Sequence, residues 1–202
     1  LNKLLDYQKK DPDNVVIISE KLNMTGYFGR RTVRLAHGRN KLLEVINKNY
    51  SHYEYMIMTD LDDKLNSEIY LNNIIKMIKR EEVWDVITFN RSNYYDIWAL
   101  RYGKYNFNCF SHKGGKTRSQ QNMLVMKIKE DIENKLKNIS KNSLFKVNSA
   151  FNGFGIYKIN KILGCKYDSL NGFECEHVPF HECLRKKNNA RISITPLKIN
   201  SD

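Results

Sequence analysis

Short apolar runs alternate along the chain with amphipathic segments, and this alternation predicts the secondary structure. The apolar runs at residues 15–19, 55–58 and 85–89 predict buried strands. Apolar positions at helical spacing predict helices at residues 1–10, 32–49, 67–80 and 121–138. The first six of these elements follow the order helix, strand, helix, strand, helix, strand. This order predicts an α/β fold with a mostly parallel sheet flanked by helices.

The second half of the chain adds a glycine-containing strand and a long loop. Residues 147–158 read as a strand, but Gly153 and Gly155 interrupt the run and predict a bulge or a close approach of backbone to a ligand. Residues 191–199 predict a last strand broken by Pro196. Residues 102–118 are polar and without periodicity, as in lids and binding loops.

The size of the chain predicts one domain. It has 202 residues, enough for a single α/β domain spanning residues 1–202. No apolar run approaches the length needed to span a bilayer, and no secretion signal is visible, so we predict a soluble cytoplasmic protein. The four cysteines are too few for a disulfide scaffold, and we expect free thiols, with a Cys165–Cys175 or Cys175–Cys183 bridge as the alternative.

The net charge of +12 favours an anionic partner. One hypothesis is a nucleic-acid-binding module. Against it, the Lys and Arg residues are spread along an Asn-rich chain and are not gathered into one basic tract. The excess of Lys and Asn is explained equally well by coding bias.

The strand predicted at residues 55–58 ends in a group of acids. Thr59 follows it, and then come Asp60, Asp62 and Asp63. Two carboxylates spaced as Asp-x-Asp at the end of a strand lie where α/β sheets bind ligands, and they suit Mg²⁺ or Mn²⁺ carrying a phosphorylated substrate. A solvated, Asp-rich turn is the alternative.

Basic residues precede this acidic group on the helix predicted at residues 32–49. The polar side of the segment carries cationic and amide groups that could reach a diphosphate: Arg31, Arg34, His37, Arg39 and Asn40. A solvated basic face explains the same pattern.

Two further segments carry candidate chemistry. The segment NYYDIWALR holds Asp96 among aromatic residues, and Trp98 with its neighbours could form a platform for a sugar ring or could belong to the core. The segment CEHVPFH supplies Glu176, His177 and His181, the densest set of ligands and bases in the second half. Pro179 and the absence of the HExxH order exclude a zinc-protease helix there.

Taken in order, the segments RTVRLAHGRNKLLEVI, YMIMTDLDD, NYYDIWALR, FNGFGIYK and CEHVPFH resemble GT-A type nucleotide-sugar glycosyltransferases. The resemblance is to the group that includes glycosyltransferase domains of large DNA viruses and, more distantly, the fungal capsule-associated mannosyltransferases. It covers nearly the whole chain, from residue 18 to residue 181. In that family a first strand that contacts the nucleotide precedes the opening helix. No such strand stands before Leu1, so we expect a GT-A (Rossmann-like) sheet that lacks it.

The resemblance implies a metal-dependent transfer of a sugar from a nucleotide-diphosphate donor to a hydroxyl of a glycan or glycoconjugate acceptor. The donor-binding half would be residues 1–100 and the acceptor-side half residues 101–202. Nucleic acid is then not an expected partner, and the cytoplasm would be that of a host if the protein is viral. A GT-A domain that binds sugar or nucleotide without catalysis is the alternative.

The resemblance also implies roles for individual residues. Donor binding falls to Arg34, Arg39, Asn40 and Asp60, and Mn²⁺ or Mg²⁺ binding falls to Asp60, Asp62 and His177. The acceptor or sugar platform comprises Trp98, Gly153 and Gly155. For the base that deprotonates the acceptor in an inverting transfer the options are Asp96 and Glu176; we prefer Glu176, with Asp96 as a contact of the acceptor or the donor sugar. In a retaining transfer neither residue needs this role.

Overall fold

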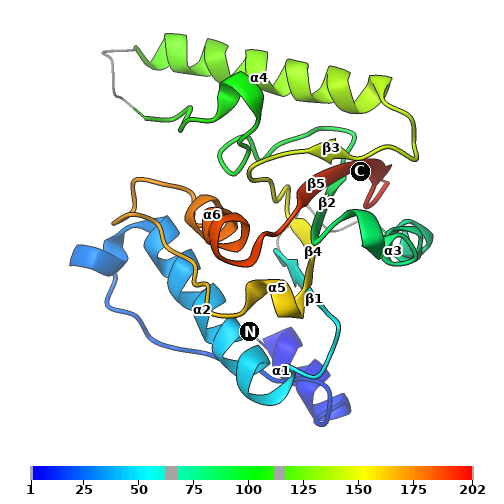
Figure 1. The fold of residues 1–202 in the computed structure, drawn as a ribbon. Helices are drawn as coiled ribbons and strands as arrows, with labels where there is room; N and C mark the ends of the chain where they lie inside the picture. Colours follow the sequence, from blue (N-terminus) through cyan, green and yellow to red (C-terminus); the bar gives the residue numbers. More distant parts are fainter. Residues whose placement is uncertain (1, 62–67, 112–116, 202) are drawn as a thin grey trace.

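The computed structural model describes residues 2–61, 68–111 and 117–201. In this part of the chain a five-stranded sheet is flanked by helices, in the order β1-β4-β2-β5-β3 (Figure 1). The strands are β1 (Tyr55–Thr59), β2 (Val86–Asn90), β3 (Phe145–Lys146), β4 (Phe154–Lys158) and β5 (Ile192–Lys198). The α-helices are α1 (Asn2–Lys10), α2 (Arg31–Asn49), α3 (Leu71–Ile78), α4 (Arg118–Asn138), α5 (Ile159–Ile162) and α6 (His177–Asn188). Short 3-10 turns are η1 (Gly26–Gly29), η3 (Glu81–Val83) and η4 (Gly103–Tyr105).

The α/β class is confirmed, but the sheet is mixed and not mostly parallel. Strand β2 pairs in parallel with β5, whereas β4 runs antiparallel to both of its neighbours, β1 and β2. Strand β3 is also antiparallel to β5. The reason is that β4, which comes later in the chain, inserts between β1 and β2 and runs antiparallel to both. Strand β1 therefore lies at the end of the sheet, and its Ile57 side chain is 49% exposed.

The strand predicted at residues 15–19 does not form. These residues have no regular secondary structure, and both Val16 and Ile18 are exposed. The apolar run finds no strand partner in the described residues, and an unpaired strand has nowhere to place its backbone hydrogen bonds.

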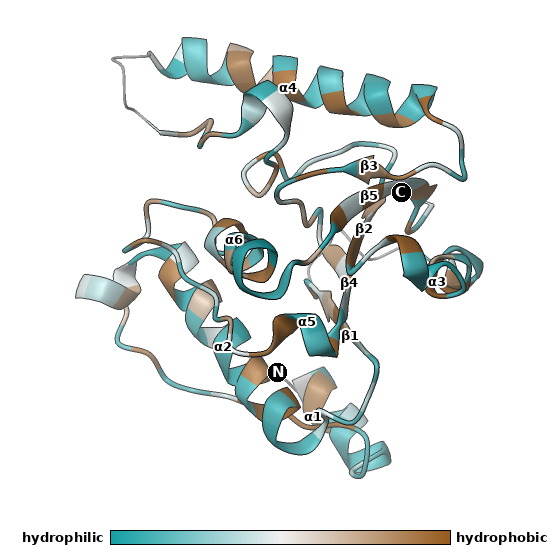
Figure 2. Cartoon of the chain, in the orientation of Figure 1, coloured by the Kyte–Doolittle hydropathy of each residue, from teal (hydrophilic) through white to brown (hydrophobic). Residues whose placement is uncertain are grey.

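Each face of the sheet carries its own hydrophobic cluster, because successive residues of a strand point to opposite faces. The larger cluster joins the sheet to α2, α4, α5 and α6 and includes Val86 and Tyr157. The smaller cluster lies under α3 and includes Ile87 and Ile156. Ile87 directly follows Val86 in β2, and Ile156 directly precedes Tyr157 in β4, so neighbouring residues belong to different clusters. Figure 2 shows hydrophilic and hydrophobic segments alternating along α2 and α4, as expected for helices that have one face on the core. None of the helices in the described ranges is long and apolar enough to cross a bilayer.

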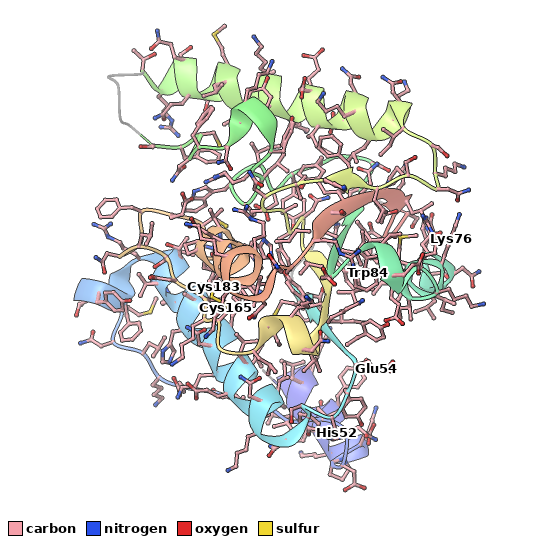
Figure 3. All side chains as sticks on the ribbon, viewed as in Figure 1. His52, Glu54, Lys76, Trp84, Cys165 and Cys183 are labelled. Atoms are coloured by element: carbon pink, nitrogen blue, oxygen red, sulfur yellow. A yellow bond between two sulfur atoms is a disulfide. The ribbon has the colours of Figure 1, made fainter. Side chains whose placement is uncertain are left out.

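A disulfide joins Cys165 to Cys183, so the expectation of four free thiols was wrong for this pair (Figure 3). Neither of the alternative bridges forms, because Cys175 is a free, buried thiol, as is Cys109. The bond fastens the loop after α5 to the middle of α6. Because the loop also carries Tyr167, whose ring lies beside the Arg39 guanidinium, the disulfide holds one wall of the region around Arg39.

Candidate functional site

Arg39 is the centre of a buried charged cluster. Helix α2 turns this residue toward the sheet, where it is 7% exposed. Its Nη2 donates to Oδ1 of Asp60 at 2.8 Å, and its Nε donates to Oε1 of Glu176 at 3.0 Å. The guanidinium also lies over the ring of Phe151, 4.9 Å from the centroid. One side chain thus joins the end of β1 to the start of α6.

The charge on Arg39 is permanent in this setting. Burial on its own lowers the pKa of a guanidinium. Here the nearby Tyr167 and the carboxylates of Asp60 and Glu176, which Arg39 binds, raise the Arg39 pKa above its ordinary value. A buried guanidinium of this kind is stable only while its acceptors remain, since an uncompensated buried charge is very costly. The cluster is therefore a tightly coupled unit.

Asp60 directly follows the last residue of β1, as the sequence predicted, and its side chain is 30% exposed. Its backbone N–H donates to the carbonyl of Gly153 at 3.1 Å. One carboxylate oxygen binds Arg39, which leaves the other for a ligand. The neighbouring acids Asp62 and Asp63 lie outside the described residues.

Asp96 is a third carboxylate of the same region. It lies in the segment after β2 and accepts hydrogen bonds from the backbone N–H groups of Ala99 and Asn152, both at 3.3 Å. Burial, together with repulsion from Glu176 and Asp60, raises the pKa of Asp96 to about 6. A carboxylate with this pKa is mostly ionised at neutral pH and is a stronger base than an ordinary aspartate.

The turn at Asn152 and Gly153 ties these segments together. Both residues have positive φ, 55° and 82°. The carbonyl of Asn152 accepts from Nε of Arg91 at 3.0 Å, and the Asn152 side chain accepts from the backbone N–H of Tyr95 at 3.2 Å. A Cβ at Gly153 would lie 2.3 Å from the Tyr95 hydroxyl oxygen. The predicted close approach at Gly153 thus involves a protein side chain.

Glu176 and His177 lie at the start of α6. Pro179 fits into the first turn of this helix, because the N–H groups there have no partner inside the helix and proline, which lacks an N–H, loses no hydrogen bond. Glu176 is 2% exposed and held by Arg39. His177 is 1% exposed and stacks on Phe151 with ring centroids 3.8 Å apart. Burial, reinforced by Arg39 and His181, lowers the pKa of His177 well below its ordinary value, so its ring is neutral.

A pocket opens next to the cluster, and two cluster residues line it. Its volume is about 370 Å³, and it lies between the irregular segment around residue 20 and α2. Arg34, Arg39 and Asp60, three of the predicted donor contacts, line it together. The Arg34 guanidinium also donates to the carbonyls of Phe28 and Gly29, at 2.7 and 2.9 Å.

The fourth predicted donor contact, Asn40, is engaged elsewhere. Its side chain donates to the carbonyl of Tyr167 at 2.9 Å and accepts from the Tyr167 N–H at 2.8 Å. This two-way pairing fastens α2 to the loop after α5. Asn40 is not among the residues that line the pocket beside Arg39.

None of the three residues predicted for the sugar platform, Trp98, Gly153 and Gly155, lines the pocket beside Arg39. Trp98 is half-buried, packs against the larger core cluster and meets Phe110 edge to face at 5.9 Å. Gly155 is buried inside β4, opposite Met58 of β1, where the Tyr157 ring covers it so closely that a Cβ would lie 2.9 Å from a ring carbon. Gly155 thus makes room for a core tyrosine.

The predicted metal ligands fit a divalent cation only in part. Asp60 offers one carboxylate oxygen. His177 is a neutral imidazole, and neither ring nitrogen has a hydrogen-bond partner among the described residues, but the ring lies inside the protein beside Arg39. No group of three His, Cys, Asp or Glu side chains in the described ranges could hold a metal ion. A site at Asp60 would need a ligand from outside these ranges, such as Asp62.

Sequence reasoning missed two members of this region. Asn152 organises three segments through its backbone and side chain, and the Asn-Gly dipeptide, which favours positive φ, is the signal that could have identified it. Phe151 supplies the aromatic face for both Arg39 and His177, and nothing in its local sequence distinguishes it from a core residue.

Comparison with known proteins adds no relative. A scan against models of protein families finds no match to this chain. A search of curated proteins finds no significant similarity.

Proposed function

We propose that this protein is a glycosyltransferase that moves a sugar from a nucleotide-diphosphate donor to a hydroxyl of a glycan or glycoconjugate acceptor. The observation that supports it best is the convergence of Arg34, Arg39 and Asp60 on one pocket, with Glu176 bound to Arg39 and Asp96 close enough to Glu176 and Asp60 to be repelled by their charge. Departure of a nucleoside diphosphate leaves negative charge on phosphate oxygens, and guanidinium groups stabilise that charge.

Asp96 is the better candidate for the base, which reverses our preference from the sequence. Glu176 is almost fully buried and committed to Arg39. In the described part of the chain the hydrogen bonds that Asp96 accepts come from backbone N–H groups and not from a cation, and its pKa is raised to about 6. In the proposed step Asp96 takes the proton of the acceptor hydroxyl while that oxygen bonds to the anomeric carbon. The bond to the nucleoside diphosphate breaks, its electrons leave with the diphosphate, and the anomeric configuration inverts.

A divalent cation, Mn²⁺ or Mg²⁺, belongs to the proposal as a cofactor that would neutralise charge on the diphosphate when bound. Asp60 is its candidate ligand in the described residues, and Asp62 is the candidate outside them. Since Asp60 already binds Arg39, a cation and this guanidinium would share one carboxylate.

The test is calorimetric titration of UDP-glucose, UDP-galactose, UDP-N-acetylglucosamine and GDP-mannose, with and without Mn²⁺. We expect at least one to bind, and we expect Asp60→Asn and Asp62→Ala to weaken binding at least tenfold in the presence of Mn²⁺. Asp60→Asn keeps the shape of the side chain and a hydrogen-bond acceptor for Arg39 but removes the negative charge. A loss of binding in this variant therefore reports the carboxylate charge and not a change in packing. Lys137→Ala, which removes an exposed charge on α4, is the control.

Two results would count against the proposal. One is that none of the four nucleotide sugars binds while duplex DNA or RNA binds with a steep dependence on salt, as expected for a nucleic-acid-binding module. The other is that a nucleotide sugar binds but no transfer to any glycan acceptor and no hydrolysis can be detected, as expected for a non-catalytic domain.

A further inference from the structure

A second cavity lies beside the charged cluster and shares no lining residue with the pocket at Arg34 and Arg39. Its volume is about 250 Å³, and it lies between α6 and the segments around residues 106 and 148. The first of these segments belongs to the long polar loop in which the sequence predicted a lid or a binding function. A cavity of this size suits a ligand of one ring.

The charged groups on its wall are of both signs. Arg101 is 4% exposed, and its Nη2 donates to Oε1 of Glu174 at 2.7 Å. Arg185 enters from α6, and its Nε is buried without a hydrogen-bond partner in the described part of the chain. Glu182 stands one turn before Arg185 on the same helix. A buried donor without an acceptor is rare and indicates a place for a ligand or water.

The remaining wall is made of amides, a hydroxyl and an aromatic ring. Asn148 donates to Oδ1 of Asn106 at 3.0 Å, which leaves the other end of each amide for a ligand. Ser149 Oγ lies 2.9 Å from Nδ1 of the buried His181. The Phe107 side chain is 40% exposed at the rim.

This mixture of groups selects for a neutral ligand rich in hydroxyl groups. Glu174 is paired with Arg101 and Glu182 with Lys186, so the carboxylates on the wall are already neutralised by cations of the protein. A sugar hydroxyl both donates and accepts, so it can bind a carboxylate, an amide and a guanidinium in the same cavity. The C–H face of a sugar ring also packs on an aromatic side chain such as Phe107.

Three segments of chain contribute both to the wall of the cavity and to the region of the charged cluster. Asp96 and Arg101 belong to one segment, and Asn152 and Asn148 belong to a second. Glu176 and Glu174, two residues apart, belong to the third. The buried Cys175 thiol feels the charges of Asp96, Glu176 and Arg101, so the cluster and the wall of the cavity lie on the two sides of one residue.

We propose that this cavity, which we call the Arg185 cavity, binds one uncharged sugar unit of an oligosaccharide acceptor, a unit that does not itself react. Its contacts are Asn106, Asn148, Glu174, Glu182 and Arg185, with Phe107 under the ring. That the sugar unit belongs to an acceptor rests on the proposed function. The binding of a neutral sugar to the cavity can be measured independently of that function.

The test is saturation-transfer difference NMR on the full chain with methyl glycosides of glucose, galactose, mannose, N-acetylglucosamine, fucose, rhamnose and xylose. We expect at least one to give a signal. Arg185→Ala and Asn148→Ala are expected to weaken its binding at least tenfold, and Lys137→Ala is expected to leave it unchanged. Chemical-shift mapping of the wild-type backbone amides, which needs no variant, is expected to move the signals of residues 106, 148 and 185.

The results separate the two proposals. If a nucleotide sugar binds but no glycoside does, or if a glycoside binds equally well to Arg185→Ala and Asn148→Ala, the Arg185 cavity is not a sugar site. Shifts confined to other residues overturn it as well. If a glycoside binds in the cavity but no nucleotide sugar binds, the donor proposal fails and the cavity remains a sugar site.

Discussion

Arg39 and Glu176 form a buried ion pair, with Nε and Oε1 3.0 Å apart and side chains 8% and 3% exposed. Removing one partner leaves the other charged and buried, which typically costs about 3–5 kcal/mol. We expect Arg39→Gln to lower the free energy of unfolding by about that amount in urea denaturation. The exposed pair of Lys186 and Glu182 is the control, since Lys186→Gln should cost less than about 1 kcal/mol. Equal losses in the two variants would contradict a buried, coupled cluster.

The raised pKa of Asp96 predicts how activity depends on pH. If Asp96 is the base, kcat/KM falls below a pKa of about 6, because only the carboxylate accepts a proton. Asp96→Asn is expected to lower kcat by at least 100-fold while it leaves nucleotide-sugar binding within about threefold. Glu176→Gln is the informative comparison. If its kcat falls more than that of Asp96→Asn while its fold and donor affinity are retained, the base is Glu176.

The same shift predicts how stability depends on pH. A folded-state pKa of about 6, above the ordinary value of 3.8, means that the native state holds this proton more tightly than the unfolded chain does. The stabilising contribution is complete below about pH 4 and is lost as pH rises through about 6. We expect the difference in unfolding free energy between wild type and Asp96→Asn to change by on the order of 2 kcal/mol across this window. Urea titrations at pH 4, 5, 6 and 7 measure it, and a flat difference would show that Asp96 titrates normally.

Gly153 is expected to tolerate no side chain. Its φ of 82° and the 2.3 Å approach to the Tyr95 hydroxyl mean that Gly153→Ala strains the backbone and displaces a neighbour. We expect a loss of about 1–3 kcal/mol in unfolding free energy. Gly38→Ala is the matched control, because Gly38 lies inside α2 with no atom within 4 Å of a Cβ, and this change should raise stability by about 0.5–1 kcal/mol. If the two variants have the same sign, the local geometry described for the turn is incorrect.

The disulfide predicts that stability depends on reducing agent. Cys165 and Cys183 are 18 residues apart, and closing a loop of that length stabilises a fold by about 3 kcal/mol. We expect reduction of the wild type and the Cys165→Ser, Cys183→Ser double variant to lower the free energy of unfolding equally. The double variant should be insensitive to reductant, since Cys109 and Cys175 are free. A double variant as stable as the oxidised wild type would show that the bond contributes little.

Local pattern predicted most elements of the fold because burial on one face leaves a period in the sequence. The run that became β1 ended at Thr59, directly before Asp60, and the period along residues 121–138 matched α4 with only its first turn missed. The same logic failed at residues 15–19, where an apolar run formed no strand. An isolated run shows only that residues are apolar and says nothing about whether a partner strand exists.

The pairing of strands was not accessible from the sequence. Strand β4 lies between β1 and β2. Its residues predict a buried strand, but they do not indicate which strands it pairs with or whether the pairing is parallel or antiparallel. The site shows the same limit. Arg39, Asp60 and Glu176 were each selected as candidates, but their meeting depends on three elements far apart in the chain. Of the two candidate bases, Glu176 is buried and bound to Arg39, whereas Asp96 is not bound to Arg39. This difference exists only in the folded chain and could not be predicted from the sequence.

The position of β1 at the end of the sheet has a consequence for how molecules of this protein meet one another. In the described part of the chain no strand pairs with its second edge, and Ile57 adds an exposed apolar side chain there. Such an edge is where strands from separate molecules join during aggregation. Concentrated samples are therefore expected to assemble through β1 first, and a lysine in place of Ile57 is the change that would keep them apart.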